Sequence, residues 1–506
     1  MKAPEILPHD EHNQRLLSYV HPADWVNPQP RGRYNLVVLG AGTAGLVTAA
    51  LAAGLGARVA LVERHLMGGD CLNVGCVPSK ALIRASRFVA EARRAEEIGL
   101  PAPRDAEIDF GAAMERMRRI RAQIAREDSA SRYRDDLGVD VYLGAARFLD
   151  ARTVAVEDRR LGFRKAVIAT GARAAAPPIE GLADAGYRTN ETIFELTSRP
   201  RRLGVIGAGP IGCELAQAFR RLGCEVVLLD HAPRILPRED ADAAAIVEAV
   251  LRREGIRLAL GAALEKVERR GAEKILRFAQ AGAGLEVAVD EILVGVGRAP
   301  NVEGLGLEAA GVDFDARRGV RVDDHLRTTN RRIYAAGDVC MDWKFTHAAD
   351  AAAKLVVQNA LFLPTKRLSS LVMPWCTYTD PEVAHVGLSE AEAAARRTAI
   401  DTWRVPLHEV NRAVTDGEEV GLVKIHVARG RDRIVGATIV AAHAGEMIGE
   451  LTLAIGAKLG LGALLGVIHP YPTQAEGIKR AAAAHARSRL TPRLARLLSG
   501  WMALRR

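Results

Sequence analysis

Two segments of the chain share one order of elements: an apolar run, a glycine trio, a helical stretch and a second apolar run that ends in an acid. The first consists of Tyr34–Leu39, Gly40-Ala41-Gly42-Thr43-Ala44-Gly45, Val59–Val62 and Glu63. Such glycines allow a tight turn and close approach of the backbone to a pyrophosphate, which then lies at a helix N-terminus. A carboxylate about 20 residues further on can accept hydrogen bonds from an adenosine ribose. The segment therefore predicts a βαβ unit that binds a dinucleotide through Gly40, Gly42, Gly45 and Glu63.

The second segment repeats this order from Arg202–Ile206 through Gly207-Ala208-Gly209-Pro210-Ile211-Gly212 to Glu225–Leu229 and Asp230. An acid at this position favours the free 2′-hydroxyl of NAD, whereas a 2′-phosphate favours arginine. His231 and Arg234 lie nearby and make the choice less clear, and Asp230 could also be a solvated carboxylate at a strand end. We expect a nicotinamide nucleotide here, NADH rather than NADPH, bound by Gly207, Gly209, Gly212 and Asp230.

Length and composition limit the class of protein. With 506 residues the chain is too long for one hydrophobic core, and its 49% hydrophobic and 26% charged residues are typical of a soluble protein. The net charge of +9 favours anionic partners, which nucleotide phosphates satisfy, and no basic-aromatic motif indicates nucleic acid. No apolar run has signal-peptide or membrane-spanning length, so we expect a cytoplasmic protein without stable membrane insertion.

The third constraint is a pair of cysteines, Cys71 and Cys76, in Gly68-Gly69-Asp70-Cys71-Leu72-Asn73-Val74-Gly75-Cys76-Val77-Pro78-Ser79-Lys80. Of the six cysteines, only these two are close enough in sequence to suggest a local pair, which excludes a secreted disulfide framework. In isolation the spacing also fits a metal site or two buried thiols. Its position soon after a dinucleotide-binding strand favours redox chemistry.

The cysteine segment resembles the active-site motif of the pyridine nucleotide-disulfide oxidoreductases. Ala169-Thr170-Gly171, Gly297-Arg298-Ala299-Pro300-Asn301 and Ala335-Ala336-Gly337-Asp338 follow in the order of that family, and the resemblance extends from Tyr34 to about residue 485. It implies FAD on the first glycine segment, with Asp338 on the ribityl and phosphate side of the flavin. The further cofactor-binding residues that it implies are Lys80, Thr170, Gly171, Gly297, Arg298 and Gly337.

The resemblance also implies roles for the reacting side chains. Cys76 is the thiolate that lies against the flavin, and Cys71 is the interchange thiol that meets the substrate. Lys80 and Glu214 match positions that pair beside the reacting ends of flavin and nicotinamide, although each could be an ordinary surface charge. A thiol with a pKa of ~8.5 must be deprotonated to attack or to bind a metal, and a helix N-terminus or a neighbouring base lowers that pKa.

The predicted fold class is α/β, with two Rossmann-like dinucleotide-binding domains, for FAD and NAD(P), and a C-terminal α+β dimerisation domain that closes a homodimer. The predicted parts are an extension (1–33), an FAD-binding domain (34–175 and 293–368), an NAD(P)-binding domain (176–292), the dimerisation domain (369–485) and a basic amphipathic tail (486–506). We expect the extension to lie on the first domain without a regular period. We expect the tail to form a helix packed on its own protein, with a membrane-surface or partner-docking role as the alternative.

One motif departs from the thiol-disulfide members of the family. Dihydrolipoamide dehydrogenases carry His-Pro-Thr-x-x-Glu, in which the histidine is the acid/base, whereas this chain has Tyr471-Pro472-Thr473-Gln474-Ala475-Glu476. A phenol with a pKa of ~10 is a poor base near neutral pH. His469 could substitute in part, or could be a packed interface residue. Tyr471 and Glu476 are nevertheless candidate catalytic residues that act across the dimer interface.

Tyrosine at this position is similar to mercuric reductases, in which thiolates bind a soft metal ion. Typical mercuric reductases also carry a vicinal cysteine pair near the C-terminus, which this chain lacks; Cys340 and Cys376 are expected to be buried free thiols. We therefore expect an NAD(P)H-dependent flavoprotein that reduces a metal ion or a small disulfide and holds no resident metal. The alternatives are a dihydrolipoamide dehydrogenase, with His469 or Tyr471 in proton transfer, and a non-catalytic flavoprotein scaffold for a partner or membrane.

Overall fold

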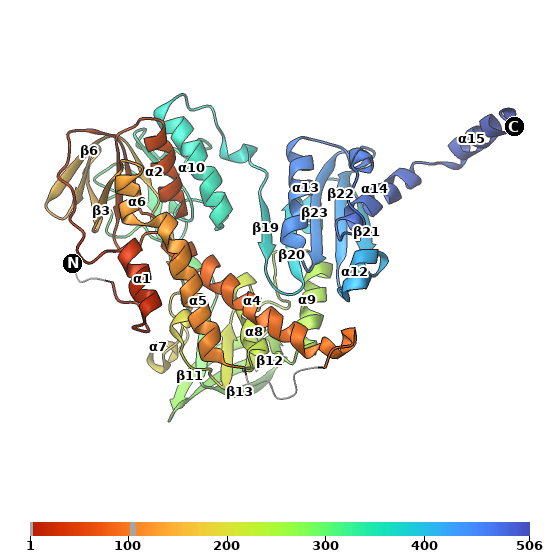
Figure 1. The fold of residues 1–506 in the computed structure, drawn as a ribbon, viewed down its shortest axis with the longest axis horizontal. Coiled ribbons are helices and arrows are strands. Elements are labelled where there is room, and N and C mark those ends of the chain that lie inside the picture. Colours follow the sequence, from red (N-terminus) through yellow and green to blue (C-terminus); the bar gives the residue numbers. More distant parts are fainter. Residues whose placement is uncertain (1–3, 102–107) are drawn as a thin grey trace. The chain divides into compact units, whose positions relative to one another are not determined.

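The computed structural model describes residues 4–101 and 108–506 and divides the chain into two compact units. Unit 1 contains residues 1–231 and 256–371, and unit 2 contains residues 232–255 and 372–506. Both mix helices and sheets, as the predicted α/β class requires (Figure 1). Within the described ranges, no helix is long and apolar enough to cross a membrane. The finer division into an extension, three domains and a tail stays a prediction.

The first sheet of unit 1 forms around the predicted strand Tyr34–Leu39, which is β1. Its order is β3-β2-β1-β6, and β18 pairs with the other edge of β6; these five strands run parallel. The helix α2 (Thr43–Gly54) packs against α10 (Thr346–Leu361) beside the sheet (Figure 1). The other strands are β2 (Val59–Glu63), β3 (Asp140–Leu143), β6 (Arg159–Ile168) and β18 (Ile333–Ala335), with antiparallel β4 (Ala146–Asp150) and β5 (Thr153–Val156) extending β6.

The second glycine segment builds a smaller parallel sheet in the same unit, in the order β10-β9-β8-β14. It agrees with the predicted strands, since β8 spans Arg202–Ile206 and β9 spans Glu225–Asp230. The intervening helix α8 (Pro210–Arg221) is buried along most of its length. The remaining strands are β10 (Arg257–Leu260) and β14 (Glu291–Val294), and an antiparallel sheet of β11 (Ala263–Arg270), β12 (Glu273–Gln280) and β13 (Ala283–Val289).

The remaining elements of unit 1 lie outside these sheets or form small pairs of strands. Two of them, α3 and α4, carry the cysteine pair. These elements are α3 (Gly69–Asn73), α4 (Cys76–Arg93), α5 (Phe110–Ile124), α6 (Ala130–Asp135), α7 (Leu182–Ala185), β7 (Ala172–Ala174), β15 (Arg298–Pro300), β16 (Phe314–Asp315) and β17 (Gly319–Val320).

The N-terminal extension lies on unit 1 as predicted, but it contains a helix that the sequence reading missed. This helix, α1 (Glu11–Val20), begins with Asp10, whose side chain accepts a hydrogen bond from the Asn13 amide. Asp10 also pairs with Arg118 of α5 at 2.5 Å. A helix of ten residues is marginal by itself in water, and the contacts of α1 with α5, together with the burial of Leu16 and Val20, supply the stability that it lacks alone.

Unit 2 consists of a five-stranded antiparallel sheet, β19-β20-β23-β22-β21, covered by helices. The predicted alternating segments form β22 and β23. Lys424 of β22 is fully buried, and its Nζ lies 2.8 Å from a carboxylate oxygen of Asp240. Asp240 is the residue before helix α9, so this ion pair ties α9 to the sheet. The bounds are β19 (Pro374–Thr377), β20 (Glu382–Gly387), β21 (Ile400–Pro406), β22 (Leu422–Ala428), β23 (Ile434–Ala441), α9 (Ala241–Arg253), α11 (Glu390–Ala395), α12 (Asn411–Asp416), α13 (Ala444–Gly456), α14 (Glu476–Ser488) and α15 (Pro492–Leu504).

The tail forms the predicted helix, α15, but the expectation that it packs on its own protein is wrong for this chain. No residue of α15 is buried. Its leucines and Trp501 remain exposed because α15 follows α14 without folding back onto the sheet of unit 2 (Figure 1).

Candidate active site

The cysteine segment folds against the first glycine turn. Gly68 and Gly69 take positive φ values of 86° and 59°, which favour glycine. A Cβ on Gly69 would lie 2.6 Å from the Cα of Gly42, so only glycine permits this approach. The two glycines of the redox motif therefore place α3 and Cys71 directly beside the turn predicted to hold the pyrophosphate.

Cys76 begins helix α4, and Cys71 lies in α3; both are free thiols, with Cys76 exposed. The Sγ of Cys76 lies 3.4 Å from Oγ1 of Thr346, the first residue of α10. A hydrogen bond from Cys71, together with Thr346 and the nearby charge of Lys80, lowers the pKa of Cys76 to about 6. The same hydrogen bond and burial raise the pKa of Cys71. One thiolate at Cys76 and one protonated thiol at Cys71 is therefore the favoured state near neutral pH.

Lys80 and Glu214 meet as the resemblance implied. Lys80 lies on α4 one turn after Cys76, and its Nζ is 2.8 Å from Oε2 of Glu214 on α8. The Glu214 side chain is only 6% exposed, so its carboxylate depends on this partner. The pair joins α4, which begins at Cys76, to α8, which begins at the second glycine turn, and the buried Glu214 is not an ordinary surface charge.

Arg298 connects three of the predicted motifs. Its guanidinium lies 3.1 Å from Asp70 of the cysteine segment and 3.2 Å from Asp338, and it donates to the carbonyl of Ala172 at 2.8 Å. Burial raises the pKa of Asp338, against the effect of Arg298. Thr170 donates to the carbonyl of Asn301 at 2.7 Å, which ties the Ala169–Gly171 and Gly297–Asn301 segments together.

The glycine turns have the shape that a pyrophosphate requires. A Cβ on Gly45 would lie 1.8 Å from the Gly40 carbonyl oxygen, and one on Gly212 would lie 1.8 Å from that of Gly207, so these glycines close the turns. A Cβ on Gly42 would come no closer than 3.7 Å to another atom, and a Cβ on Gly209 would meet nothing within 4 Å. These two glycines precede α2 and α8 and provide no capping side chain. Free backbone N–H groups at two helix N-termini fit the phosphates of two dinucleotides.

Both predicted ribose acids end their strands beside these turns. Glu63 accepts hydrogen bonds from the amides of Ala41 at 2.7 Å and His65 at 2.8 Å, and burial raises its pKa. Asp230 accepts one from the amide of Ala208 at 2.6 Å. Each carboxylate keeps lone pairs for a ribose hydroxyl. Gly171, Gly297 and Gly337 have positive φ values of 67°, 138° and 81°, and Gly337 approaches α2 closely enough that a Cβ would meet Ala44 at 3.3 Å.

The tyrosine motif lies in unit 2. The Tyr471 side chain is exposed, and its hydroxyl accepts a hydrogen bond from Asn411 at 3.0 Å. Glu476 begins α14 and pairs with Arg480 at 3.1 Å, while the side chain of the half-buried residue His469 is 7% exposed and lies 3.1 Å from Glu450. Within the described parts of the chain, no hydrogen bond joins Glu476 to Tyr471, so the orienting pair of the thiol-disulfide enzymes is not formed by these two residues.

The other cysteines form no second redox pair in the described ranges, and Cys340 and Cys376 are free thiols that are half-buried rather than fully buried as expected. Burial raises the pKa of Cys340 to about 12, and its Sγ lies 3.6 Å from the carbonyl of Gly337. Cys376 lies in unit 2 with its Sγ 3.6 Å from the carbonyl of Thr377. Among residues 4–101 and 108–506, no three His, Cys, Asp or Glu side chains are grouped to hold a metal ion.

Sequence reasoning missed three contributors to the site. Thr346 is 270 residues from Cys76, and no motif marks it. Arg121 of α5 donates to the carbonyl of Asn73 at 2.6 Å and to the side chain of Asn13 at 2.6 Å. Asn13 belongs to α1, so the N-terminal extension contacts the cysteine segment through one buried arginine.

Comparison with known proteins decides the family. The family model described as pyridine nucleotide-disulphide oxidoreductase matches residues 34–353, and its dimerisation domain matches residues 373–482. The chain belongs to this family. Members of the family use FAD and NAD(P)H, and the two glycine turns fit these two dinucleotides. The chain is therefore a flavoprotein oxidoreductase.

Relatives of two kinds are similar to the chain. A mercuric reductase of Lysinibacillus sphaericus is 35% identical over 449 residues, which cover 89% of this chain and 82% of that protein. A dihydrolipoyl dehydrogenase of Thermus scotoductus is 35% identical over 462 residues, which cover 89% of this chain and 97% of that protein. Neither identity is high enough to separate the two activities.

Solved structures agree on the fold. The Cu(II) complex of the HOCl-induced flavoprotein disulfide reductase RclA from Escherichia coli has a TM-score of 0.80 and 27% identity, and the match covers 90% of this chain and 100% of that one. LpdA from Mycobacterium tuberculosis has a TM-score of 0.80 and 28% identity, with 89% of this chain and 99% of that chain covered.

Proposed function

We propose that the protein is an NAD(P)H-dependent reductase whose Cys71 and Cys76 hold a metal ion as the electron acceptor, in the manner of mercuric reductases. The observation that carries this proposal is the state of the two thiols. Cys76 has a lowered pKa, whereas Cys71 has a raised one and keeps its proton near neutral pH. The family position for the base that would take this proton holds Tyr471, so the acceptor must react with Cys71 without the help of a strong base.

A thiophilic metal ion meets this requirement, because metal binding itself displaces thiol protons. A disulfide acceptor needs a base to take the proton of Cys71, and the family position for that base holds Tyr471. The relatives named mercuric reductase and the Cu(II) complex of RclA support the same class of acceptor. A homodimer, a cytoplasmic location and NADH as the donor are parts of this proposal.

The residues of the chain have distinct parts in the proposed reaction. Bound flavin would take a hydride from NAD(P)H and deliver two electrons. Lys80 and Glu214 would fix the reacting ends of the two cofactors, and the glycine turns would hold their phosphates. Cys76 and Cys71 would bind the metal ion as thiolates. The balance for a mercuric ion is NAD(P)H + Hg(II) giving NAD(P)⁺, H⁺ and Hg(0).

Dihydrolipoamide dehydrogenase activity is the second candidate. The chain covers 97% of the Thermus scotoductus enzyme, and His469 paired with Glu450 is a histidine-carboxylate pair two residues before Tyr471. This candidate requires His469 to reach the thiols. It predicts fast oxidation of dihydrolipoamide by NAD⁺, which is lost in His469→Gln.

The test compares steady-state turnover with Hg(II) in excess thiol, Cu(II), lipoamide and glutathione disulfide. We expect fast turnover with a metal ion that is lost in Cys76→Ser and Cys71→Ser. Tyr471→Phe should slow metal reduction, and Tyr471→His should raise turnover with lipoamide. Fast lipoamide turnover in the unmodified protein would replace the proposal with the second candidate, and slow turnover with all four acceptors would reject both.

A further inference from the structure

Helix α15 (Pro492–Leu504) is a feature of the chain that the redox function does not use. It lies beyond residue 482, where the match to the dimerisation domain ends. No residue of it is buried, and Thr491 caps its start through the amide of Leu494. A capped helix that buries nothing retains its whole side-chain surface for a partner.

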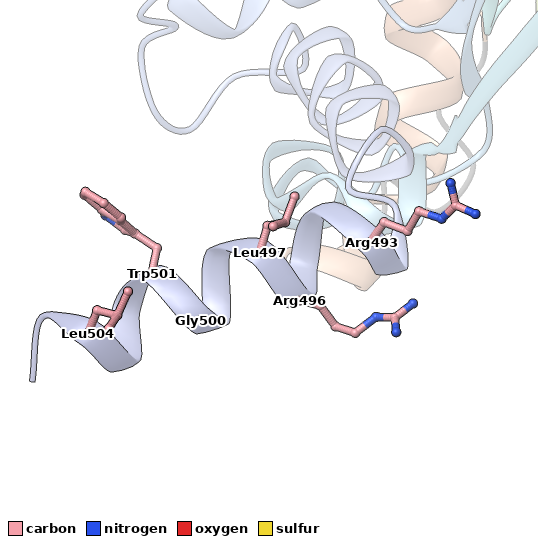
Figure 2. A pocket seen from close by; sticks show the side chains of 6 residues that line it. All are labelled: Arg493, Arg496, Leu497, Gly500, Trp501 and Leu504. Carbon is pink, nitrogen blue, oxygen red and sulfur yellow. The ribbon is translucent and has the colours of Figure 1, made fainter.

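One side of α15 is apolar. Leu494, Leu497, Leu498 and Trp501 follow the i, i+3, i+4, i+7 spacing of a helix face, and Leu504 continues it. All five are exposed, Leu497 at 72% and Leu504 at 84%. A shallow groove at Gly500 lies between apolar and basic side chains (Figure 2). Leu497 and Trp501 project from one side of the helix, and Arg496 projects from the other (Figure 2).

The charge around this face has a single sign. The chain from Ala486 to Arg506 contains no Asp or Glu, and its six arginines are Arg487, Arg489, Arg493, Arg496, Arg505 and Arg506. Within the described structure, none of the six forms an ion pair. Arg505 instead lies over the ring of Trp501, 5.3 Å from its centre. The helix therefore offers an apolar strip flanked by uncompensated positive charge.

We propose that α15 binds the surface of an anionic lipid membrane, with Leu497 and Trp501 in the interface and the arginines on the lipid phosphates. Leucine and tryptophan opposite arginine is the pattern of a helix that lies in the membrane plane. A second copy of the chain fits less well, because two α15 helices face to face would bring like charges together. At 13 residues, the helix is too short to span a bilayer, so the attachment is peripheral.

The test is sedimentation of the full-length holoenzyme with vesicles of phosphatidylcholine alone or mixed equally with phosphatidylglycerol. We expect binding only to the mixed vesicles, weakening as salt rises. Leu497→Glu removes apolar contact and should weaken binding roughly tenfold or more. Ala503→Glu makes the same charge change on the opposite side of the helix and should bind much more tightly than Leu497→Glu. Arg493→Ser with Arg496→Ser should weaken binding roughly tenfold or more.

NADH oxidation and the oligomeric state, measured on the same preparations, separate the alternatives. We expect both to be unchanged in all variants, because α15 lies outside the redox site. Equal binding of the unmodified protein to both kinds of vesicle would overturn the proposal. So would a change of oligomeric state in Leu497→Glu without vesicle binding by the unmodified protein, since that result would assign the apolar face to a second copy of the chain.

Discussion

The Nζ of Lys80 lies 2.8 Å from a carboxylate oxygen of Glu214, and this ion pair joins helix α4 to helix α8. The first helix carries Cys76 and the second begins at the glycine turn predicted to bind NAD(P)H. We expect Lys80→Met to leave a buried carboxylate without its partner and to slow flavin reduction by NADH roughly tenfold or more, because misplaced reactants react slowly. Stopped-flow absorbance of the flavin measures this rate.

A matched control is the pair of Lys274 and Glu291, also 2.8 Å apart and in unit 1 but on strands away from the cysteines. Lys274→Met should lower the melting temperature without changing the rate of flavin reduction. Equal slowing in both variants would mean that Lys80 acts only through general stability.

The pKa of Cys76 predicts a pH dependence. Because the folded protein lowers this pKa to about 6 from the ordinary ~8.5 of a thiol, the reduced enzyme carries the thiolate above pH 6 and loses it as the pH falls further. Thr346→Val removes one hydrogen bond to the thiolate and should raise the pKa by about one unit. The charge-transfer absorbance of the reduced holoenzyme, titrated against pH, gives both midpoints. Thr346→Ser should restore the original midpoint; a variant midpoint equal to that of the unmodified protein would contradict the role of Thr346.

Asp230 predicts the choice of nucleotide. Its carboxylate ends β9 and can accept hydrogen bonds from a ribose 2′-hydroxyl but repels a 2′-phosphate. We expect a lower KM for NADH than for NADPH, and Asp230→Ala should raise the KM for NADH roughly tenfold while that for NADPH stays equal or falls. Steady-state kinetics with both nucleotides decide the matter. A preference of the unmodified protein for NADPH would contradict this role of Asp230.

Arg121 predicts a link between the N-terminal extension and the cysteine segment. Arg121→Met leaves the Asn73 carbonyl and the Asn13 side chain without this donor, at a cost of about 2–4 kcal/mol in the free energy of unfolding. Because Asn73 lies in α3 with Cys71, we also expect faster alkylation of Cys71 in the reduced enzyme. Arg119→Met, on the exposed side of the same helix, is the control for both measurements. Unchanged alkylation in Arg121→Met would limit Arg121 to a stabilising role.

Much of the fold could be predicted because its signals are local. An apolar run that ends at a glycine turn specifies β1 and β8, and alternation specifies β22 and β23. The pairing of Lys80 with Glu214 came from the family resemblance, since nothing local relates positions on different helices. Thr346 could not be found because its contact with Cys76 depends on the packing of α10 alone. Helix α1 was missed because its stability comes from Arg118 and Arg121 of another helix.

The tail shows what a local signal cannot predict. Its periodicity correctly predicted a helix, but periodicity gives only the direction of the apolar face and not the surface that covers it. The expectation of internal packing followed from what is usual for terminal helices, and the exposed Leu497 and Leu504 contradict it.

The most direct test of the central claim counts the thiols that NADH creates. The oxidised holoenzyme is alkylated under denaturing conditions before and after anaerobic addition of NADH, and the labelled cysteines are located by mass spectrometry. A two-electron donor should convert one disulfide to two thiols, so we predict that Cys71 and Cys76 become labelled only after NADH, while Cys213, Cys224, Cys340 and Cys376 are labelled in both samples. Labelling of Cys71 and Cys76 that does not depend on NADH, although the flavin is reduced, would contradict a redox-active pair.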